Sequence, residues 1–235
     1  VISSTRYLIG DSVISGIGTG ISLYDSNTTS IINNSIDVGR AGIIIDSCLY
    51  INISENRLKD SSIYIIGHNI SEYSTHEILN NTVNDRPVLY IKNAYDQVMN
   101  FSGSDISAMP NEIIIVNVHN VTLSNIYIDN GSAGILMAYA NRIMLHDVII
   151  NNETVVGIEM TQCSNMSLNF LELFNCDIGI AMYSTHYGNI SACIFKGMDM
   201  YAIFIDGWSH NIRIHGNNFY GSGNRSLAYS DSESI

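Results

Sequence analysis

A four-residue pattern recurs along the chain at nearly constant spacing: glycine, an apolar residue, any residue and a second apolar residue. It occupies residues 20–23, 42–45, 134–137, 157–160 and 179–182. Ser62, Pro87, Glu112 and Ala202 stand in the place of the glycine elsewhere, so that successive starts lie 20 to 25 residues apart. A repeat of this length indicates a solenoid, in which each unit buries its apolar face only against its neighbours.

Asparagines recur in two columns that keep phase with this pattern. Stacked asparagine side chains can hydrogen-bond from one turn to the next, and asparagine tolerates the left-handed backbone of a sharp corner. We therefore predict structural ladders along the solenoid. Their members are Asn34, Asn56, Asn81 and Asn217 in one column and Asn120, Asn141, Asn165, Asn189 and Asn211 in the other.

The apolar residues alternate with a period of two, which is typical of strands with one buried face, and about one residue in six is isoleucine. No helix-length pattern separates the strands, so strands of successive turns must pair directly. We predict an all-β fold, a right-handed single-stranded parallel β-helix of about ten rungs. A single domain is expected over residues 1–229, followed by a polar tail at 230–235.

Two loop excursions interrupt the rhythm, near residues 67–76 and 94–109. Around them the outward positions are apolar, and we expect a stripe over five successive rungs. Because large apolar patches seldom stay bare, the favoured interpretation is that an excursion folds back over this stripe. The alternative is an exposed surface for a partner or ligand. The expected stripe consists of Ile44, Tyr64, Leu89, Ile114 and Leu136.

The chain has 235 residues and a formal net charge of -12, and its ten Lys and Arg residues are scattered. Nucleic acid is therefore not expected as a partner, because phosphate-rich surfaces require clustered basic residues. No apolar run approaches the roughly 18 residues of a transmembrane helix. The start carries no initiator Met and no signal-peptide pattern, so we expect Val1 to begin either a mature chain or a piece of a longer polypeptide, and we favour the longer polypeptide.

Residues 81–90 and 112–123 resemble the NosD-type β-helix repeat family, whose members read Asn-Thr-Val-Asn-Gly-Lys-Pro before a loop and an Asn-Val-Thr-like strand after it. Here Asp85 and Arg86 replace the usual Gly-Lys. The resemblance implies the wider pectin-lyase-like superfamily, an extracellular, cell-surface or periplasmic location, and contact with glycans. It implies no catalytic site, because the family has no agreed catalytic motif.

Clustered carboxylates would indicate an active site, because β-helix lyases and glycosidases place several acids on one outward strip. One loose cluster contains Glu159 and Asp206 as candidate acid or base, with Tyr183 and Trp208 as an aromatic platform for a sugar ring. No Lys or Arg stands beside them to act as a lyase base. We favour scattered acids on a solvated face over an active site.

The four cysteines and seven histidines are expected to bind no metal and no cofactor. We interpret Cys48, Cys163, Cys176 and Cys193 as buried free thiols, because their rungs or columns differ. His186 and His210 come nearest to a metal-binding pair, but their places in the repeat are offset by about two residues.

Asn-x-Ser/Thr sequons are frequent, partly because the repeat itself generates them. Ladder asparagines are too engaged for glycosylation, so sites in loops are the better candidates. These are Asn69, Asn100, Asn130 and Asn152.

Three functional hypotheses remain open. The first is a non-catalytic module of a secreted or cell-surface protein, serving as a rigid spacer or as a surface that binds polysaccharide or another surface protein. The second is a polysaccharide-active lyase, epimerase or hydrolase that uses Glu159 and Asp206. The third, a periplasmic copper-maturation protein, follows from the family resemblance alone.

Overall fold

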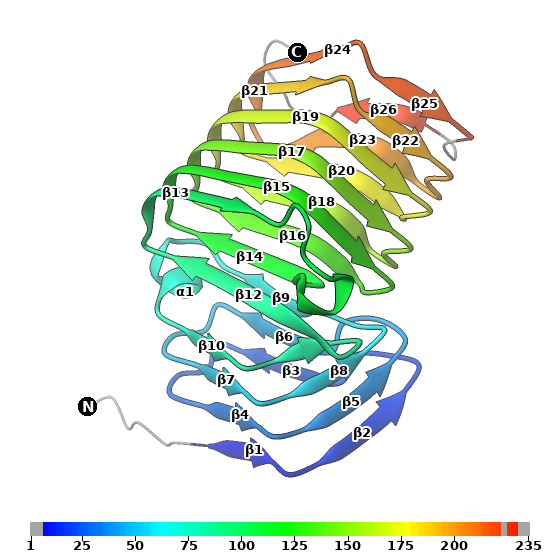
Figure 1. The fold of residues 1–235 in the computed structure, drawn as a ribbon. Coiled ribbons are helices and arrows are strands. Elements are labelled where there is room, and N and C mark those ends of the chain that lie inside the picture. Colours follow the sequence, from blue (N-terminus) through cyan, green and yellow to red (C-terminus); the bar gives the residue numbers. More distant parts are fainter. Residues whose placement is uncertain (1–6, 222–224, 230–235) are drawn as a thin grey trace.

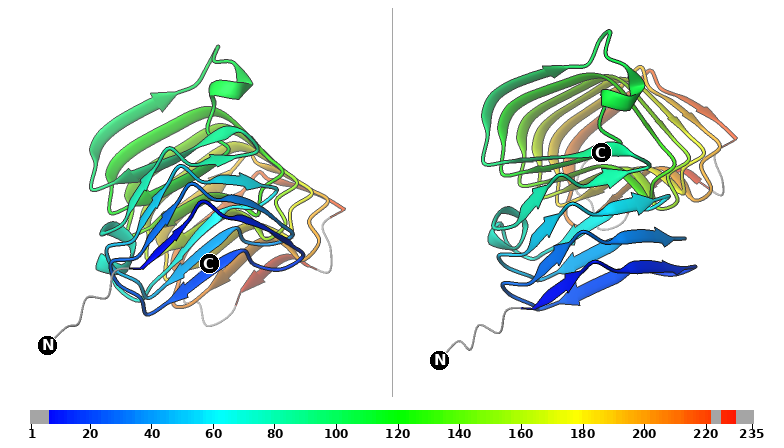
Figure 2. Two further views of the ribbon diagram at one scale, coloured as in Figure 1. Left: turned by 90° about the horizontal axis from the view of Figure 1, so that it is seen from below. Right: turned by 60° about the horizontal axis from the view of Figure 1, so that its bottom comes forward.

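The computed structural model describes residues 7–221 and 225–229. Short strands coil into about ten turns, and nearly all neighbouring strands are parallel, which confirms the predicted parallel β-helix (Figure 1). Coils near the amino end form a first stack and the later coils form a second stack beyond it (Figure 2).

The first stack has three columns of strands with two to four residues each. Their bounds are β1 (Leu8–Gly10), β2 (Val13–Gly16), β3 (Ile21–Tyr24), β4 (Ser30–Ile32), β5 (Ser35–Val38), β6 (Ile43–Asp46), β7 (Asn52–Ser54), β8 (Arg57–Lys59), β9 (Ile63–Ile66), β10 (Glu77–Leu79) and β11 (Thr82–Val83). The helix α1 (Ser71–Ser74) lies in the excursion after β9.

The second stack contains longer strands, three of which run for 11 residues around a corner. Its strands are β12 (Arg86–Lys92), β13 (Tyr95–Asn100), β14 (Glu112–Val116), β15 (His119–Asp129), β16 (Ala133–Ala138), β17 (Asn141–Asn151), β18 (Val156–Thr161), β19 (Ser164–Phe174), β20 (Ile178–Tyr183), β21 (His186–Ser191), β22 (Ile194–Lys196), β23 (Tyr201–Asp206), β24 (His210–His215), β25 (Asn218–Tyr220) and β26 (Arg225–Tyr229). A 3-10 turn, η1 (Ile106–Ala108), lies in the second excursion.

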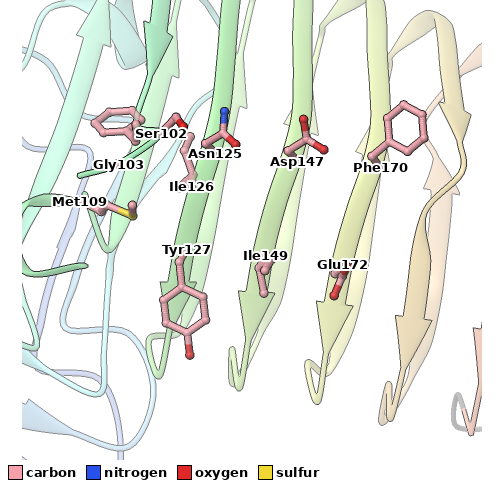
Figure 3. Close-up of a pocket in the computed structure, with 11 residues that line it drawn as sticks. Ser102, Gly103, Met109, Asn125, Ile126, Tyr127, Asp147, Ile149, Phe170 and Glu172 are labelled. Carbon is pink, nitrogen blue, oxygen red and sulfur yellow. The ribbon is translucent and has the colours of Figure 1, made fainter. Parts of the chain in front are cut away.

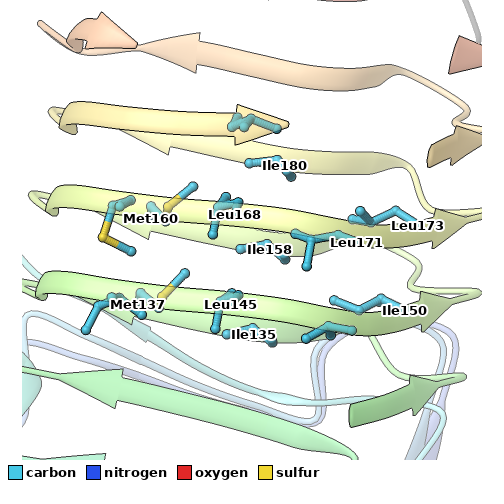
Figure 4. Close-up of a cluster of buried hydrophobic side chains, with 14 of the residues drawn as sticks. Ile135, Met137, Leu145, Ile150, Ile158, Met160, Leu168, Leu171, Leu173 and Ile180 are labelled. Atoms are coloured by element: carbon cyan, nitrogen blue, oxygen red, sulfur yellow. The ribbon is translucent and has the colours of Figure 1, made fainter. Parts of the chain in front are cut away.

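Identical apolar residues of successive coils stack in register in the core. Ile135, Ile158 and Ile180 follow one another on β16, β18 and β20 and are fully buried (Figure 4). The rung-start glycines are needed for close approach rather than for unusual backbone angles. A Cβ atom on Gly134 would lie 2.7 Å from the carbonyl oxygen of Gly157 in the next rung.

A hairpin between the stacks reverses the chain. β11 and β12 pair antiparallel, Val83 opposite Arg86, and the two turn residues Asn84 and Asp85 both have positive φ. Two consecutive residues with positive φ are typical of a type I′ turn. The sheet nevertheless continues without interruption from β2 to β26 through eleven strands.

This reversal moves the interior to the other face of the shared sheet. Val83 points into the core of the first stack, whereas Leu89 and Ile91 pack into the core of the second. Because side chains alternate along a strand, the outer face of β12 and β14 continues the inner face of β11. The first core therefore extends onto Ile114 and Leu136.

The predicted apolar stripe needs one correction. Leu89 is not part of it, because it pairs with Ile113 and faces inward; Tyr90 pairs with Ile114 and holds the outward place. The first excursion covers the stripe as expected, with Tyr73 of α1 buried against it. The second excursion lies elsewhere, since β13 pairs with β15 at the edge of another sheet.

The asparagine columns differ from one another. Asn34, Asn56 and Asn81 form a buried ladder. Asn34 Nδ2 donates to Asn56 Oδ1, and Asn56 Nδ2 donates to Asn81 Oδ1, both at 2.9 Å. Asn217 accepts from the Cys193 backbone N–H and donates to the Ile190 carbonyl.

The five residues of the other predicted column do not share one place in the coil. Asn120, Asn165 and Asn211 hold a corner with φ near +57° (58°, 55° and 56°). Asn141 instead pairs with His119, and Asn189 pairs with Ser167.

The polar tail predicted at residues 230–235 lies outside the described part of the chain. No helix among the described residues is long and apolar enough to cross a membrane.

Candidate ligand groove

The outer face of the second stack carries a groove over β15, β17 and β19. The inner residues of these strands, such as Leu171 and Leu173, fill the core, so the residues between them must point outward. One outward row on three successive strands consists of Tyr127, Ile149 and Glu172 (Figure 3).

A second row lies at the corner within the same strands: Asn125, Asp147 and Phe170 (Figure 3). All three have positive φ, between 53° and 57°. Asparagine and aspartate tolerate this left-handed conformation, but a bulky aromatic residue rarely adopts it. Phe170 is also 61% exposed, so the fold holds an aromatic ring at the surface at some conformational cost.

The second excursion forms one wall of the groove. Phe101 and Met109 line it together with Tyr127 and Phe170, and the space they enclose is about 400 Å³. A second hollow of about 400 Å³ adjoins it, shares Tyr127 and Ile149, and extends to Phe174 and Lys196. The two hollows lie side by side along the strands, and together they form a groove that spans the rungs of β15, β17 and β19.

Arg86 holds the wall against the floor of this groove. Its guanidinium donates to the carbonyls of Met109 (3.3 Å) and Pro110 (3.1 Å) in the wall. It also donates to the Tyr127 carbonyl and to Asp129 Oδ1 at 2.8 Å in the floor, and it lies over the Tyr127 ring. Arg86 is almost fully buried, so this network is rigid and well shielded from solvent.

The predicted acid pair does not come together closely. Glu159 pairs with Ala181, which pairs with Phe204, so Glu159 and Asp206 lie two rungs and two residues apart. This places their Cα atoms about 12 Å from each other. Burial raises the pKa of Glu159 to about 7, at the margin of the covered stripe.

The predicted aromatic platform is partly assembled. Tyr183 pairs in register with Asp206, and its ring lies 5.9 Å from that of Phe204. Trp208 is 71% exposed. This face is distinct from the groove, and whether it binds a sugar stays a prediction.

The predicted offset between the two candidate histidines is wrong. His186 and His210 pair directly, and their rings stack at 4.0 Å rather than being offset by two residues. Among the described residues, no group of three or more His, Cys, Asp or Glu side chains is placed to hold a metal ion. All four cysteines are buried free thiols, as predicted.

Two buried carboxylates escaped the sequence analysis. Glu112 accepts the Ile63 backbone N–H with both carboxylate oxygens (2.9 and 3.1 Å), and burial raises its pKa. Glu153 accepts the Gly131 N–H at 3.2 Å, and burial raises its pKa to about 8. The sequence contains a sign of the buried Glu112, because this charged residue stands at a rung start that is elsewhere glycine, serine or another uncharged residue.

The four candidate glycosylation sites, Asn69, Asn100, Asn130 and Asn152, are all exposed. Their modification stays a prediction.

Stacked parallel coils with a lateral groove define this chain as a β-helix protein. It belongs to the right-handed β-helix family, whose sequence model, described as the right handed beta helix region, matches residues 87–235. No curated protein matches the sequence.

Two solved structures are similar to the chain. ORF18 of Geobacillus virus E2 is 10% identical, with 99% of this chain and 55% of that chain covered at a TM-score of 0.24. The tailspike receptor binding domain of Siphovirus 9NA is 9% identical, with 92% and 52% covered at a TM-score of 0.23. This chain spans about half the length of each.

Proposed function

We propose that this chain is an extracytoplasmic, non-catalytic β-helix module of a secreted or cell-surface protein, and that its groove binds an extended polysaccharide. The observation that carries the proposal is the groove over three rungs, with Tyr127, Phe170 and Phe174 on its surface. Binding sites characteristically combine aromatic surface with a few polar groups that fix orientation.

The placement of the groove favours a sugar chain. It lies on the face of a sheet whose backbone groups are already paired between rungs, so a ligand must be recognised by side chains rather than by strand addition. Rungs repeat about every 4.8 Å, close to the length of one sugar unit in an extended polysaccharide. A chain lying along the solenoid axis would present successive units to successive rungs.

A non-catalytic role is favoured over a polysaccharide-active enzyme of the pectin-lyase-like superfamily. Paired carboxyl groups in glycosidases lie about 5–10 Å apart. Glu159 and Asp206 are separated by an intervening rung, and that rung carries Ala181 and Tyr183.

We also propose NosD-type kinship, supported by residues 81–90, which form the chain-reversing hairpin and the strand after it. Copper maturation has no observation in its favour and is not proposed.

The test is calorimetric titration of the purified protein with soluble neutral, cationic and anionic polysaccharides, together with assays for new reducing or unsaturated ends. Phe170→Asn and Phe174→Asn remove a ring and install the residue that Asn125 and Asn151 already provide in the same rows. Each should weaken binding about tenfold, or about 1.4 kcal/mol. Tyr24→Asn, which removes an exposed ring from the first stack, is the matched control and should have no effect.

Absence of binding across the panel would refute the groove as a glycan site. If the wild-type protein produces new polysaccharide chain ends and Glu159→Gln or Asp206→Asn does not, the protein is an enzyme and the proposed non-catalytic role is wrong.

A further inference from the structure

Glu172 occupies an unusual position on the floor of the groove. It pairs in register with Ile149 on one side and Ile194 on the other, so its carboxylate projects from an apolar row. The side chain is half-buried, and among the described residues it has no hydrogen-bond or ion-pair partner. A carboxylate that has lost part of its water shell without gaining a donor is a ready acceptor for a charged ligand group.

Both charged side chains that line this hollow, Asp147 and Glu172, are acidic. Asp147 projects into the same hollow from the corner row, on the rung before Glu172 (Figure 3). His146 lies beside it, with Nδ1 2.8 Å from Asp147 Oδ2. No Lys or Arg lines this hollow, and Lys196 belongs to the adjoining hollow.

We propose that the groove selects a polysaccharide containing free amino sugars, with Glu172 receiving the ammonium group. This inference rests on the proposed function and names its ligand class. The carboxylate accepts a charge-assisted hydrogen bond from the amine, and Asp147 adds favourable charge on the neighbouring rung. Polyuronates are excluded from this hollow, because two carboxylates would face the carboxylates of the ligand.

A glycan fits this site better than a basic peptide does. Phe170 and Tyr127 flank the acids with ring surface, on which the flat apolar face of a sugar ring packs. A peptide would leave its backbone amides without partners, since the groove floor has no free strand edge.

The experiment compares three hexasaccharides at pH 6: glucosamine, N-acetylglucosamine and galacturonate. Acetylation removes the charge and leaves the sugar backbone unchanged, so it isolates the ammonium. We expect glucosamine hexamer to bind at least about tenfold more tightly than the other two, with an affinity that falls as salt is raised. In Glu172→Gln, the preference for glucosamine over N-acetylglucosamine should disappear while binding of the acetylated hexamer remains.

Glu55→Gln is the charge-matched control, because Glu55 is an exposed acid in the first stack. It should leave the preference intact. Equal binding of the free and acetylated hexamers by the wild-type protein would overturn the inference and leave the proposed function standing. Tighter binding of oligolysine than of glucosamine hexamer would also overturn it, and failure of every glycan would overturn the proposed function itself.

Discussion

The buried carboxylate of Glu153 predicts an unusual dependence of stability on pH. The residue is 1% exposed, its Oε1 accepts the Gly131 N–H, and its Oε2 has no partner among the described residues. Burial first, and then the charge of the nearby Asp129, raise the folded-state pKa from 4.5 to about 8. The folded protein therefore keeps a proton that the unfolded chain releases.

The sign follows from this difference in proton binding. A raised pKa stabilises the folded state fully below pH 4.5, and this contribution is lost progressively as the pH rises towards 8. Each pH unit within that window costs up to about 1.4 kcal/mol, so the total is roughly 5 kcal/mol. Glutamine has the shape of the protonated acid and no titration, so Glu153→Gln should remove this part of the pH dependence.

The assay is urea unfolding of the wild-type protein and of Glu153→Gln at pH 5, 6, 7 and 8. The two should have nearly equal stability at pH 5, and the variant should be more stable by several kcal/mol at pH 8. Glu112 contributes a slope of the same sign in both proteins. Because the charge of Glu153 raises the pKa of Glu112, the difference between the two proteins reports Glu153 together with this coupling. Parallel stability curves across the whole range would show that Glu153 is ionised in the folded protein, and the reasoning would fail.

Three further substitutions test the fold and the groove. Arg86→Met should destabilise the protein by about 3 kcal/mol because Asp129 loses its partner, and amide hydrogen exchange should accelerate at residues 101–110. Arg86→Lys should not restore the protection from exchange, because one ammonium group cannot hydrogen-bond to the wall and to the floor at the same time. Asn56→Ala should lower the free energy of unfolding by about 3 kcal/mol or more, measured in thermal or urea unfolding, because it leaves buried ladder groups unpaired. The control Asn33→Ala, at an exposed position, should lower it by less than about 1 kcal/mol. Gly134→Ala should lower the midpoint of thermal unfolding markedly because its Cβ meets a carbonyl at 2.7 Å, while Gly18→Ala, which meets nothing within 4 Å, should not; equal shifts would contradict the packing argument.

The repeat made the fold class predictable because each rung obeys the same local rules. Period-2 alternation, rung-start glycines and the Asn34–Asn56–Asn81 ladder all reflect contacts between neighbouring rungs, so they recur in the sequence at the spacing of the rungs. The reversal between the stacks could not be found in this way. It depends on one two-residue turn, Asn84-Asp85, which moves the core to the other face of the sheet and carries Leu89 inward.

The same limit explains the errors at the site. Register within a β-helix depends on how many residues each corner takes up, and corners of different length displaced the predicted partners of Asn141, Asn189 and His186. Polar clusters such as Glu112 and Glu153 form between segments far apart in the chain, where no local pattern constrains them. The groove likewise combines three adjacent strands with a wall from an earlier excursion.

The long strands of the second stack explain why the groove lies there. Strands in the first stack have two to four residues, so each coil has narrow faces broken by frequent corners. β15, β17 and β19 each continue for 11 residues through a corner at positive φ, which brings two outward rows onto one concave face. The hairpin at residues 84–85 then places Arg86 where it can fasten the excursion along the edge of that face. One tight turn thus reverses the chain and also supplies the residue that fastens the wall of the groove.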